Sequence, residues 1–473
     1  MTWSRRNFIG NAALAGGVLG AGLAAKARAV APSEDLVERM EASIGVMPVD
    51  DTHCHPFGDS DAQTTVDDFI ERIALVAWPI SSYFPDGVYE RYRQDDAATR
   101  AALDKQYGIR GIRDAVCRHF ESSVFVKYML KEMAQFLDCK PVFAEVIEAR
   151  NARSKDYAGY ARSLFRHGNI ATLMIDTGFS AGLDQKGLDH FESVLAPATK
   201  IHYIARVEKL SDDLLWQEKE LSYEDLRESF VARVRDALDG TGNFGRRSVG
   251  MKSYLLPDIG VIRPTYDDGL AAASWKEFRK MRDAPYADRA EGQARGRVLR
   301  ERLLTLALEE CLVRDMPMQF HAGDGEAPSV ILRNQHPYYL EEVARFDRDG
   351  VMRMPKIIPI HAGYPLVGEA AWLSHLYTNV YFELSLMTPF IHQGLLHRYL
   401  EIMEAVPLSK MLFGSDAYYV PELHWLAARW GKRYLAQALS VYVAGGLLDE
   451  AEALEGARMI LHLNNRKVYN LEA

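Results

Sequence analysis

Two histidines one residue apart follow a short apolar run near residue 50. Residues 46–49 could form a strand. The stretch VDDTHCHP begins at the last of them, Val49, and contains His53 and His55. Successive side chains of a strand point to opposite faces, so these imidazoles would share one face while Cys54 points to the other. Such a pair can chelate a metal ion, although an isolated pair is more often two unrelated polar residues leaving a strand. A metal site therefore requires further ligands elsewhere in the chain.

Other polar side chains stand at the ends of later apolar runs. These runs cover residues 171–176, 201–207, 249–254, 317–321, 357–361, 380–384 and 411–416, and with the opening run they predict eight strands. The polar residues at or just after their ends are Arg206, Glu208, Lys252, His321, His361 and Asp416. Burying a charged or imidazole group without a partner is costly, so this repetition is hard to ascribe to chance. We expect these groups to converge with the two histidines on one site.

The elements that would position this site alternate between short strands and longer helical patterns. Such alternation is typical of βαβ units and a parallel sheet. Eight strands in this order predict an α/β fold, a (β/α)8 TIM barrel, whose chemistry takes place at the C-terminal ends of the strands. Residues 64–164 carry amphipathic helical spacing and no convincing strand, which predicts a helical insertion after the first strand.

The first 29 residues form a separate unit. They contain the twin-arginine pattern SRRNFI, an uncharged stretch over residues 11–25 and the sequence Ala27-Arg28-Ala29, which fits a cleavage site. A membrane anchor is the alternative, but the apolar run is short and rich in glycine. We expect residues 1–29 to be an export signal of the twin-arginine route and residues 30–473 to be a periplasmic barrel protein without a stable membrane anchor.

Composition limits the classes of partner. The whole chain carries a formal net charge of −9, and loss of the four basic residues of the signal makes the mature chain more acidic. An acidic surface argues against nucleic acid as a partner. The four cysteines form no CxxC pair and give weak evidence on redox environment. The sequence favours a small-molecule substrate and is compatible with a homo-oligomer.

Six longer motifs accompany the strand-end residues. They are GMKSYLL, QFHAGDG, IPIHAGYPLVGEAAWL, NVYFELS, KMLFGSDAYYVPELHWLA and ARMILHLNNRKVYN. Together with the HxH pair, they make the chain resemble the amidohydrolase superfamily of metal-dependent hydrolases. The likeness is strongest to its amidohydrolase-related branch and to the domain that nodulin-like plant proteins carry fused to glutamine synthetase. Relatives in that branch tend to follow the lysine strand with a Tyr-Arg pair, where this chain has Leu256-Pro257-Asp258.

The resemblance implies a division of roles within the site. His53, His55, His321 and Asp416 would hold a divalent metal, most simply Zn²⁺, with Mn²⁺ or Fe²⁺ suited to the same ligands. The metal would activate water at neutral pH, and Asp416 would take the proton from that water. His361 would polarise the substrate carbonyl.

Lys252 and Arg206 leave alternatives open. In binuclear relatives a lysine on the fourth strand is carboxylated and bridges two metals, and the residue matching His361 is then a ligand as well. An uncarboxylated Lys252 would have to be neutral or turned toward a substrate carboxylate. Arg206 suits a substrate carboxylate or a structural ion pair with Glu208, and Tyr254 would line the rim of the site.

Three functions compete at this stage. A hydrolase acting on an amide, lactam or ester is favoured, because a metal-activated water beside a carboxylate base is a general way to attack an acyl carbon. A nonoxidative decarboxylase of the same branch is the alternative enzyme. A binding protein that keeps the barrel without turnover is the third, and the presence of a ligand at every expected strand argues against it.

Overall fold

The computed structural model describes residues 31–74, 80–85, 87–216, 221–240, 242–282, 294–323, 331–345 and 354–471. The export signal predicted for residues 1–29 lies outside the described residues. No described helix combines the length and the low charge that crossing a bilayer requires.

A six-stranded parallel sheet with strand order β1-β2-β3-β4-β5-β6 forms the centre of the described fold. Its strands are β1 (Val49–Cys54), β2 (Ile170–Asp176), β3 (Lys200–Arg206), β4 (Ser248–Ser253), β5 (Met318–His321) and β6 (Ile357–Ile360). A second parallel pair consists of β7 (Phe382–Glu383) and β9 (Met411–Leu412), and β8 (Ser385–Leu386) follows β7 directly. The strand order matches the chain order, as expected for consecutive βαβ units.

Backbone hydrogen bonds join the two sheets at both edges. At one seam, the Tyr381 amide donates to the Ile357 carbonyl over 2.9 Å, beside β6. At the other seam, the Thr52 amide in β1 donates to the Phe413 carbonyl over 3.0 Å, just after β9. The strands therefore close into the predicted (β/α)8-type barrel.

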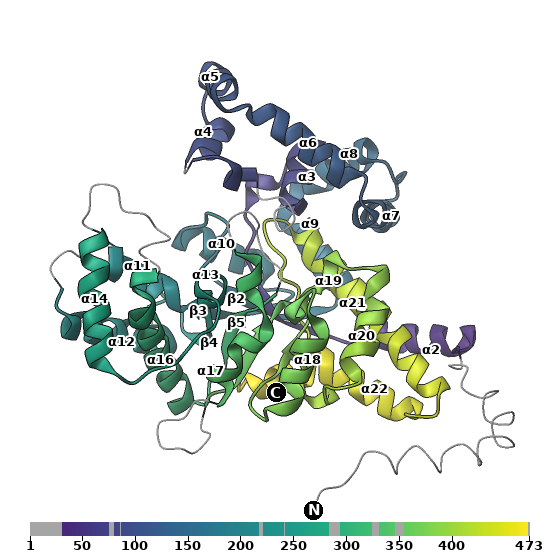
Figure 1. The fold of residues 1–473 in the computed structure, drawn as a ribbon. Helices are drawn as coiled ribbons and strands as arrows, with labels where there is room; N and C mark the ends of the chain where they lie inside the picture. The colour runs from purple at the N-terminus through teal and green to yellow at the C-terminus, as the bar shows by residue number, and fades with distance from the viewer. Residues whose placement is uncertain are drawn as a thin grey trace, which may run out of the picture.

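Helices surround this barrel (Figure 1). They are α2 (Glu34–Gly45), α10 (Gln185–Leu195), α11 (Val207–Trp216), α12 (Tyr223–Asp239), α13 (Leu255–Ile259), α14 (Asp268–Arg282), α16 (Arg297–Val313), α17 (Glu341–Arg345), α18 (Val367–Leu376), α19 (Met387–Phe390), α20 (Gln393–Met403), α21 (Pro421–Ala444), α22 (Glu450–Arg458) and α23 (Asn464–Val468). Helix α12 illustrates the pattern: its buried Leu226, Phe230 and Val234 recur every four residues and so share the face that packs inward. The Ser222 side chain caps its N-terminus by accepting from the Asp225 amide.

The segment between β1 and β2 is helical, with no strand among its described residues. Its helices are α3 (Val66–Ala74), α4 (Val88–Gln94), α5 (Ala97–Tyr107), α6 (Ile109–Glu121), α7 (Val124–Leu137), α8 (Phe143–Arg153) and α9 (Tyr157–Gly168). Figure 1 shows α3 to α8 as a group at one end of the barrel. The predicted insertion after the first strand is therefore present, and α9 returns the chain to the barrel wall by packing against α21.

The bounds of several strands differ from those predicted. The opening strand is Val49–Cys54 and not residues 46–49, because α2 runs to Gly45 and exposed Val46 is its C-terminal cap. The last two strands are shorter than the apolar runs that predicted them. At Asp416 the backbone has a φ of 55°, so the chain has left the extended conformation before the end of the predicted strand.

Candidate metal centre

His53, His55 and Asp416 meet at the C-terminal end of the barrel. His53 Nε2 lies 3.2 Å from Asp416 Oδ1, and His55 Nε2 lies 3.3 Å from the same oxygen. All three side chains are buried, and their ligand atoms are close enough together to hold one ion. Two imidazoles and a carboxylate are a donor set that suits Zn²⁺ and related divalent ions.

The orientation of His55 fits a ligand role. Its Nδ1 lies 3.0 Å from the carbonyl oxygens of Asp176 and Phe179, so the hydrogen on Nδ1 is donated to the backbone. The lone pair is then on Nε2, the atom that faces Asp416. Metal-binding histidines commonly use one ring nitrogen as ligand and fix the ring by donating from the other.

The position of Asp416 follows from contacts between β1 and the segment after β9. The Asp416 amide donates to the His53 carbonyl over 2.8 Å. One residue earlier, the Ser415 amide donates to Asp51 over 3.0 Å, and the Ser415 hydroxyl donates to the same carboxyl group. Burial raises the pKa of Asp51 to about 7. These bonds fix the carboxylate of Asp416 beside the two histidines, although the histidines precede Asp416 by more than 350 residues in the sequence.

The protonation states at the centre favour metal binding. Burial, with the neighbouring charge of Lys252, lowers the pKa of His53 to about 3, so this imidazole is neutral at pH 7. Burial opposes ionisation of Asp416, but the imidazoles of His361 and His53 hold its pKa well below its usual range. Neutral imidazoles and an ionised carboxylate are the forms that coordinate a cation.

His361 and His321 lie at the edge of this group. His361 Nδ1 is 3.8 Å from Asp416 Oδ2, and His361 Nε2 is 3.0 Å from His321 Nδ1. His321 is not part of the compact group that the described residues form around Asp416, so its predicted role as a ligand stays a prediction. The ring of Tyr254, predicted at the rim, lies with its centroid 4.5 Å from that of His321.

Lys252 occupies the interior of the centre. Its Nζ lies 3.0 Å from His53 Nε2 and 3.2 Å from Asp176 Oδ2. Burial lowers the pKa of Lys252, while the charge of Asp176 opposes the shift. Arg206 also pairs with Asp176, whereas the sequence favoured Glu208 as its partner. Glu208 instead accepts from the Ser253 hydroxyl over 2.8 Å.

Two carboxyl groups of this network were not predicted from the sequence. Asp176 ends the apolar run of β2, and a polar residue in that position was a usable but overlooked signal. Glu383 lies within the motif NVYFELS, where its burial in β7 could not be read from the sequence. It accepts from the Ser385 hydroxyl over 2.7 Å and from the His361 amide over 3.0 Å, and burial raises its pKa to about 8.

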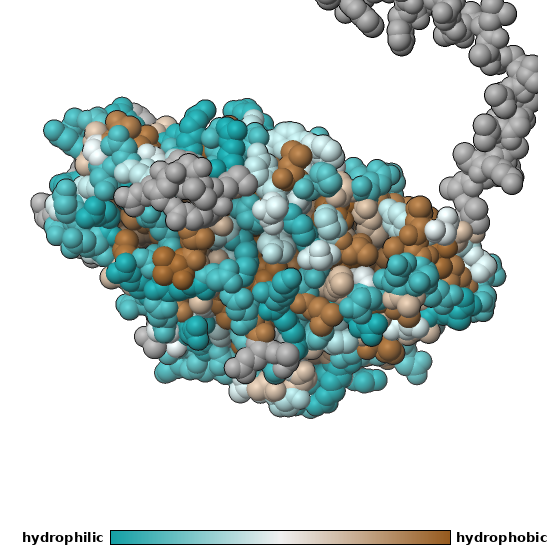
Figure 2. All heavy atoms as spheres, turned by 90° about the horizontal axis from the view of Figure 1, so that it is seen from below, coloured by the Kyte–Doolittle hydropathy of each residue, from teal (hydrophilic) through white to brown (hydrophobic). Residues whose placement is uncertain are grey.

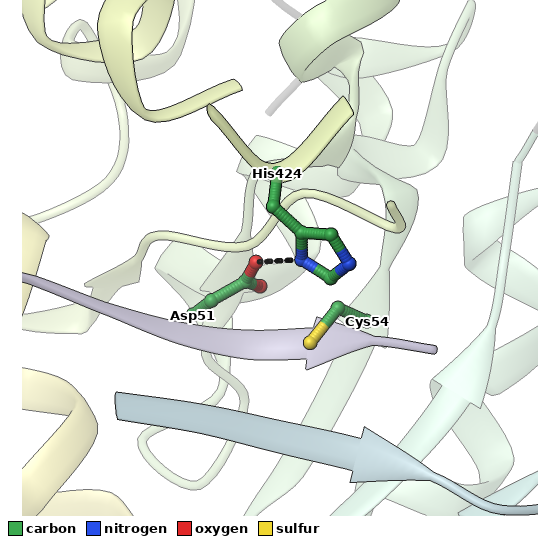
Figure 3. Close-up of side chains that lie close together, drawn as sticks. All are labelled: Asp51, Cys54 and His424. Carbon is green, nitrogen blue, oxygen red and sulfur yellow. Dashed lines mark ion pairs between the residues drawn. The ribbon is translucent and has the colours of Figure 1, made fainter. Parts of the chain in front are cut away.

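Cys54 lies on the other side of β1, as strand alternation predicts. Figure 3 shows it with Asp51 below the imidazole of His424, which comes from α21. His424 Nδ1 is 3.9 Å from Asp51 Oδ2, and the Cys54 thiol is 3.7 Å from the Met174 carbonyl. Since Asp51 already accepts from the neighbouring Ser415, we assign this group to the packing between β1 and α21.

A cavity of about 500 Å³ lies between the insertion and the barrel rim. Its walls include Arg72 and Arg93 from α3 and α4, and Tyr419 from the loop that carries Asp416. The Tyr419 ring is 5.5 Å from the ring of Phe179, which is 5.1 Å from that of His55. The cavity is therefore large enough for a small molecule, and the rings of Tyr419 and Phe179 lie between it and His55.

Comparison with known proteins shows which family the C-terminal part of the chain resembles. Residues 282–471 match the amidohydrolase family model, and this region contains His321, His361 and Asp416. Over these residues the chain is similar to the amidohydrolase family. Its resemblance to the amidohydrolase superfamily, predicted from the motifs, is confirmed.

Individual similar proteins extend the comparison. Protein fluG of Emericella nidulans is 25% identical over 338 residues, which are 67% of this chain and only 37% of that protein. A candidate metal-dependent hydrolase of Lactobacillus casei has a TM-score of 0.66 at 22% identity, over 91% of this chain and 97% of its own. A glucuronate isomerase of Caulobacter crescentus has a TM-score of 0.60 at 13% identity, over 94% and 96%. At these identities the two structures support the fold alone.

Proposed function

We propose that this protein is a metal-dependent hydrolase that attacks an amide, lactam or ester carbonyl of a small molecule. The observation that carries the proposal is the convergence of His53 Nε2 and His55 Nε2 on Asp416 Oδ1, at 3.2 and 3.3 Å. A divalent ion held there, which we propose to be Zn²⁺, would supply a Lewis acid that activates water at neutral pH.

The residues of the centre have separable tasks in this proposal. His53 and His55 would each offer Nε2 to the ion, and His55 is held in place by its bonds to backbone carbonyls. Asp416 is ionised and accepts the proton of the attacking water, which it then delivers to the leaving group. His361, next to Asp416, donates to the substrate oxygen as negative charge develops there.

Lys252 distinguishes a centre with one ion from a centre with two. A cationic ammonium 3.0 Å from His53 Nε2 would repel a divalent ion at that nitrogen. We propose that Lys252 is either carboxylated, in which case it and His361 become ligands of a second ion, or held neutral by burial. Retention of the full metal content by His361→Asn would favour the centre with one ion.

The cavity beside Tyr419 is the proposed entry for the substrate. Arg93 has no ion pair among the described residues, and Arg72 stacks over the Tyr419 ring at 4.1 Å. A substrate that reaches from the centre into this cavity would place polar or anionic groups near the two guanidinium groups.

The experiment is a substrate screen with a matched pair of variants. The metal-loaded protein is incubated with N-acyl amino acids, γ-glutamyl compounds and lactones, and the products are identified by mass spectrometry. We expect release of an acid with an amine or alcohol, and loss of turnover by several orders of magnitude in Asp416→Asn. Asp236→Asn, an exposed change on α12, should behave as wild type. Release of CO₂ from aromatic carboxylates, or isomerisation of a sugar acid without hydrolysis, would contradict the proposal.

We also propose that the protein is exported by the twin-arginine route. The support is the sequence of residues 1–29 alone. Mass spectrometry of the native protein should find Val30 as the first residue of a periplasmic chain. An intact Met1 on a cytoplasmic chain would contradict export.

A further inference from the structure

A second cavity, of about 450 Å³, lies at the end of the barrel opposite to the metal centre. Its walls include residues at or just before the N-terminal ends of β3, β4 and β5, namely Lys200, Val249 and Met316, and the C-terminal residues 469–471. The metal centre lies at the other ends of the same strands. On β3, His202 faces this cavity, whereas Arg206 pairs with Asp176 at the centre, and four residues of strand span about 13 Å.

The lining of this cavity is basic. Lys200, Arg247, Arg314 and Arg466 line it from four different segments, and the described residues of its lining include no carboxylate side chain. Figure 2 views the molecule from below, opposite to the insertion, and hydrophilic residues predominate on this face, with separated apolar groups between them. The polar lining and surroundings suit a charged ligand better than an apolar one.

Two of the four cations are already paired. Arg314 Nε donates to Asp239 over 2.6 Å, and its Nη1 donates to Glu310 over 2.6 Å. Arg466 Nε donates to Asp50 over 3.0 Å. These pairs hold the two guanidinium groups in place at the wall of the cavity.

The other two cations form no ion pair with a carboxylate among the described residues, although the charge of Arg247 also acts on Asp239. Arg247 Nε donates only to the Leu238 carbonyl, over 3.3 Å, and Lys200 begins β3 with an exposed side chain. His202, half-buried beside them, adds a neutral imidazole, because burial and the charge of Lys200 lower its pKa. Like charges gathered around one hollow repel each other, so an anion bound there would relieve this repulsion.

We propose that this cavity binds a small molecule that carries phosphate groups. Guanidinium groups bind phosphate through paired hydrogen bonds, and an ammonium group adds a point charge, so Arg247 and Lys200 together suit a tetrahedral oxyanion. The volume lies within the range of small-molecule pockets and exceeds what a single phosphate needs. The site is separate from the metal centre and does not depend on the proposed hydrolase activity.

The test is calorimetric titration of the protein as purified with inorganic phosphate, against chloride at equal ionic strength. We expect saturable binding that Lys200→Ala combined with Arg247→Ala weakens at least tenfold. The control combines Lys127→Ala and Lys131→Ala, which remove the same charge from the exposed face of α7. This control should leave the affinity unchanged. Equal affinity in both double variants, or no saturation up to 10 mM phosphate, would overturn the proposal.

A second measurement uses the unmodified protein and does not depend on how the variants fold. Acetylation of Lys200 by acetic anhydride is followed by mass spectrometry, with Lys127 as the internal reference. Phosphate should slow acetylation of Lys200 relative to Lys127 by several-fold. The same relative rate with and without phosphate would overturn the proposal.

Discussion

His361 Nδ1 lies 3.0 Å from the hydroxyl oxygen of Ser385. That hydroxyl is also 2.7 Å from Glu383 Oε2, and it has a single hydrogen to donate. When Glu383 is ionised, Ser385 donates to it and accepts from His361 Nδ1, so His361 Nε2 accepts from His321. When Glu383 is protonated, the direction reverses and His361 Nε2 carries the hydrogen. Ser385 therefore links a buried carboxyl group to the hydrogen position on a histidine of the metal centre.

Replacing Ser385 by alanine should break this link. Groups that orient the residues of a metal site typically contribute 10- to 100-fold in metal affinity or activity, and we expect a loss of about that size. Competition with a chelator gives the affinity, and ¹⁵N NMR of the histidine rings reports which nitrogen of His361 carries hydrogen. Ser440→Ala is the matched control, because Ser440 is a buried serine that donates only within α21. Unchanged affinity and unchanged NMR signals in Ser385→Ala would contradict the link.

Cys54→Ala should cost stability and leave the metal content unchanged. The thiol is fully buried beside the Met174 carbonyl and is not part of the group formed by His53, His55 and Asp416, so its removal leaves a small cavity in the core. We expect a loss of about 1 to 2 kcal/mol in the free energy of unfolding, measured in urea. Cys139→Ala, at a partly exposed position, should cost less. Loss of metal from a folded Cys54→Ala protein would show that the thiol belongs to the centre.

Lys432 should make stability depend on pH. Its Nζ donates to the carbonyls of Gly168 and Gly45, and burial, with the charge of Arg429, lowers its pKa from 10.5 to about 7. Between these values the unfolded chain binds a proton that the folded chain does not, so this contribution to stability rises with pH. It is complete above pH 10.5 and is lost as the pH falls toward 7.

The measurement compares unfolding of wild type and Lys432→Met in urea from pH 7 to 9. The free energy of unfolding of the wild type should rise relative to the variant by up to about 1.4 kcal/mol per pH unit. A constant difference between the two proteins across this range would show that Lys432 is charged in the folded state.

The barrel could be predicted from the sequence because the pattern that indicates it is local. Apolar runs of strand length, separated by helical patterns, identify βαβ units without knowledge of their neighbours. Strand-end polarity likewise indicated His53, His55, His361 and Asp416, since polar groups there are costly to bury alone. The predicted bounds of the first strand were wrong. The residues that follow Val49 are polar yet buried, so they lack the apolar pattern from which a strand is predicted.

The partners within the centre could not be predicted in the same way. Asp176 is a partner of Lys252 and Arg206 because the pairing register of β2, β3 and β4 places the C-terminal ends of these neighbouring strands side by side. Glu383 is buried because its strand, β7, pairs with β9 in the barrel wall, and a sequence offers no sign that distinguishes it from an exposed glutamate. Such pairings depend on residues far apart in the chain, which local patterns do not connect.

Metal content is the most direct test of the central claim that His53, His55 and Asp416 hold a catalytic ion. Elemental analysis by mass spectrometry should find at least one divalent transition metal ion per wild-type chain after loading and desalting. His55→Ala, which removes one nitrogen facing Asp416, should retain less than a tenth of that amount while remaining folded by circular dichroism. A wild-type chain that binds no such ion, or a His55→Ala chain that retains the full content, would contradict the account.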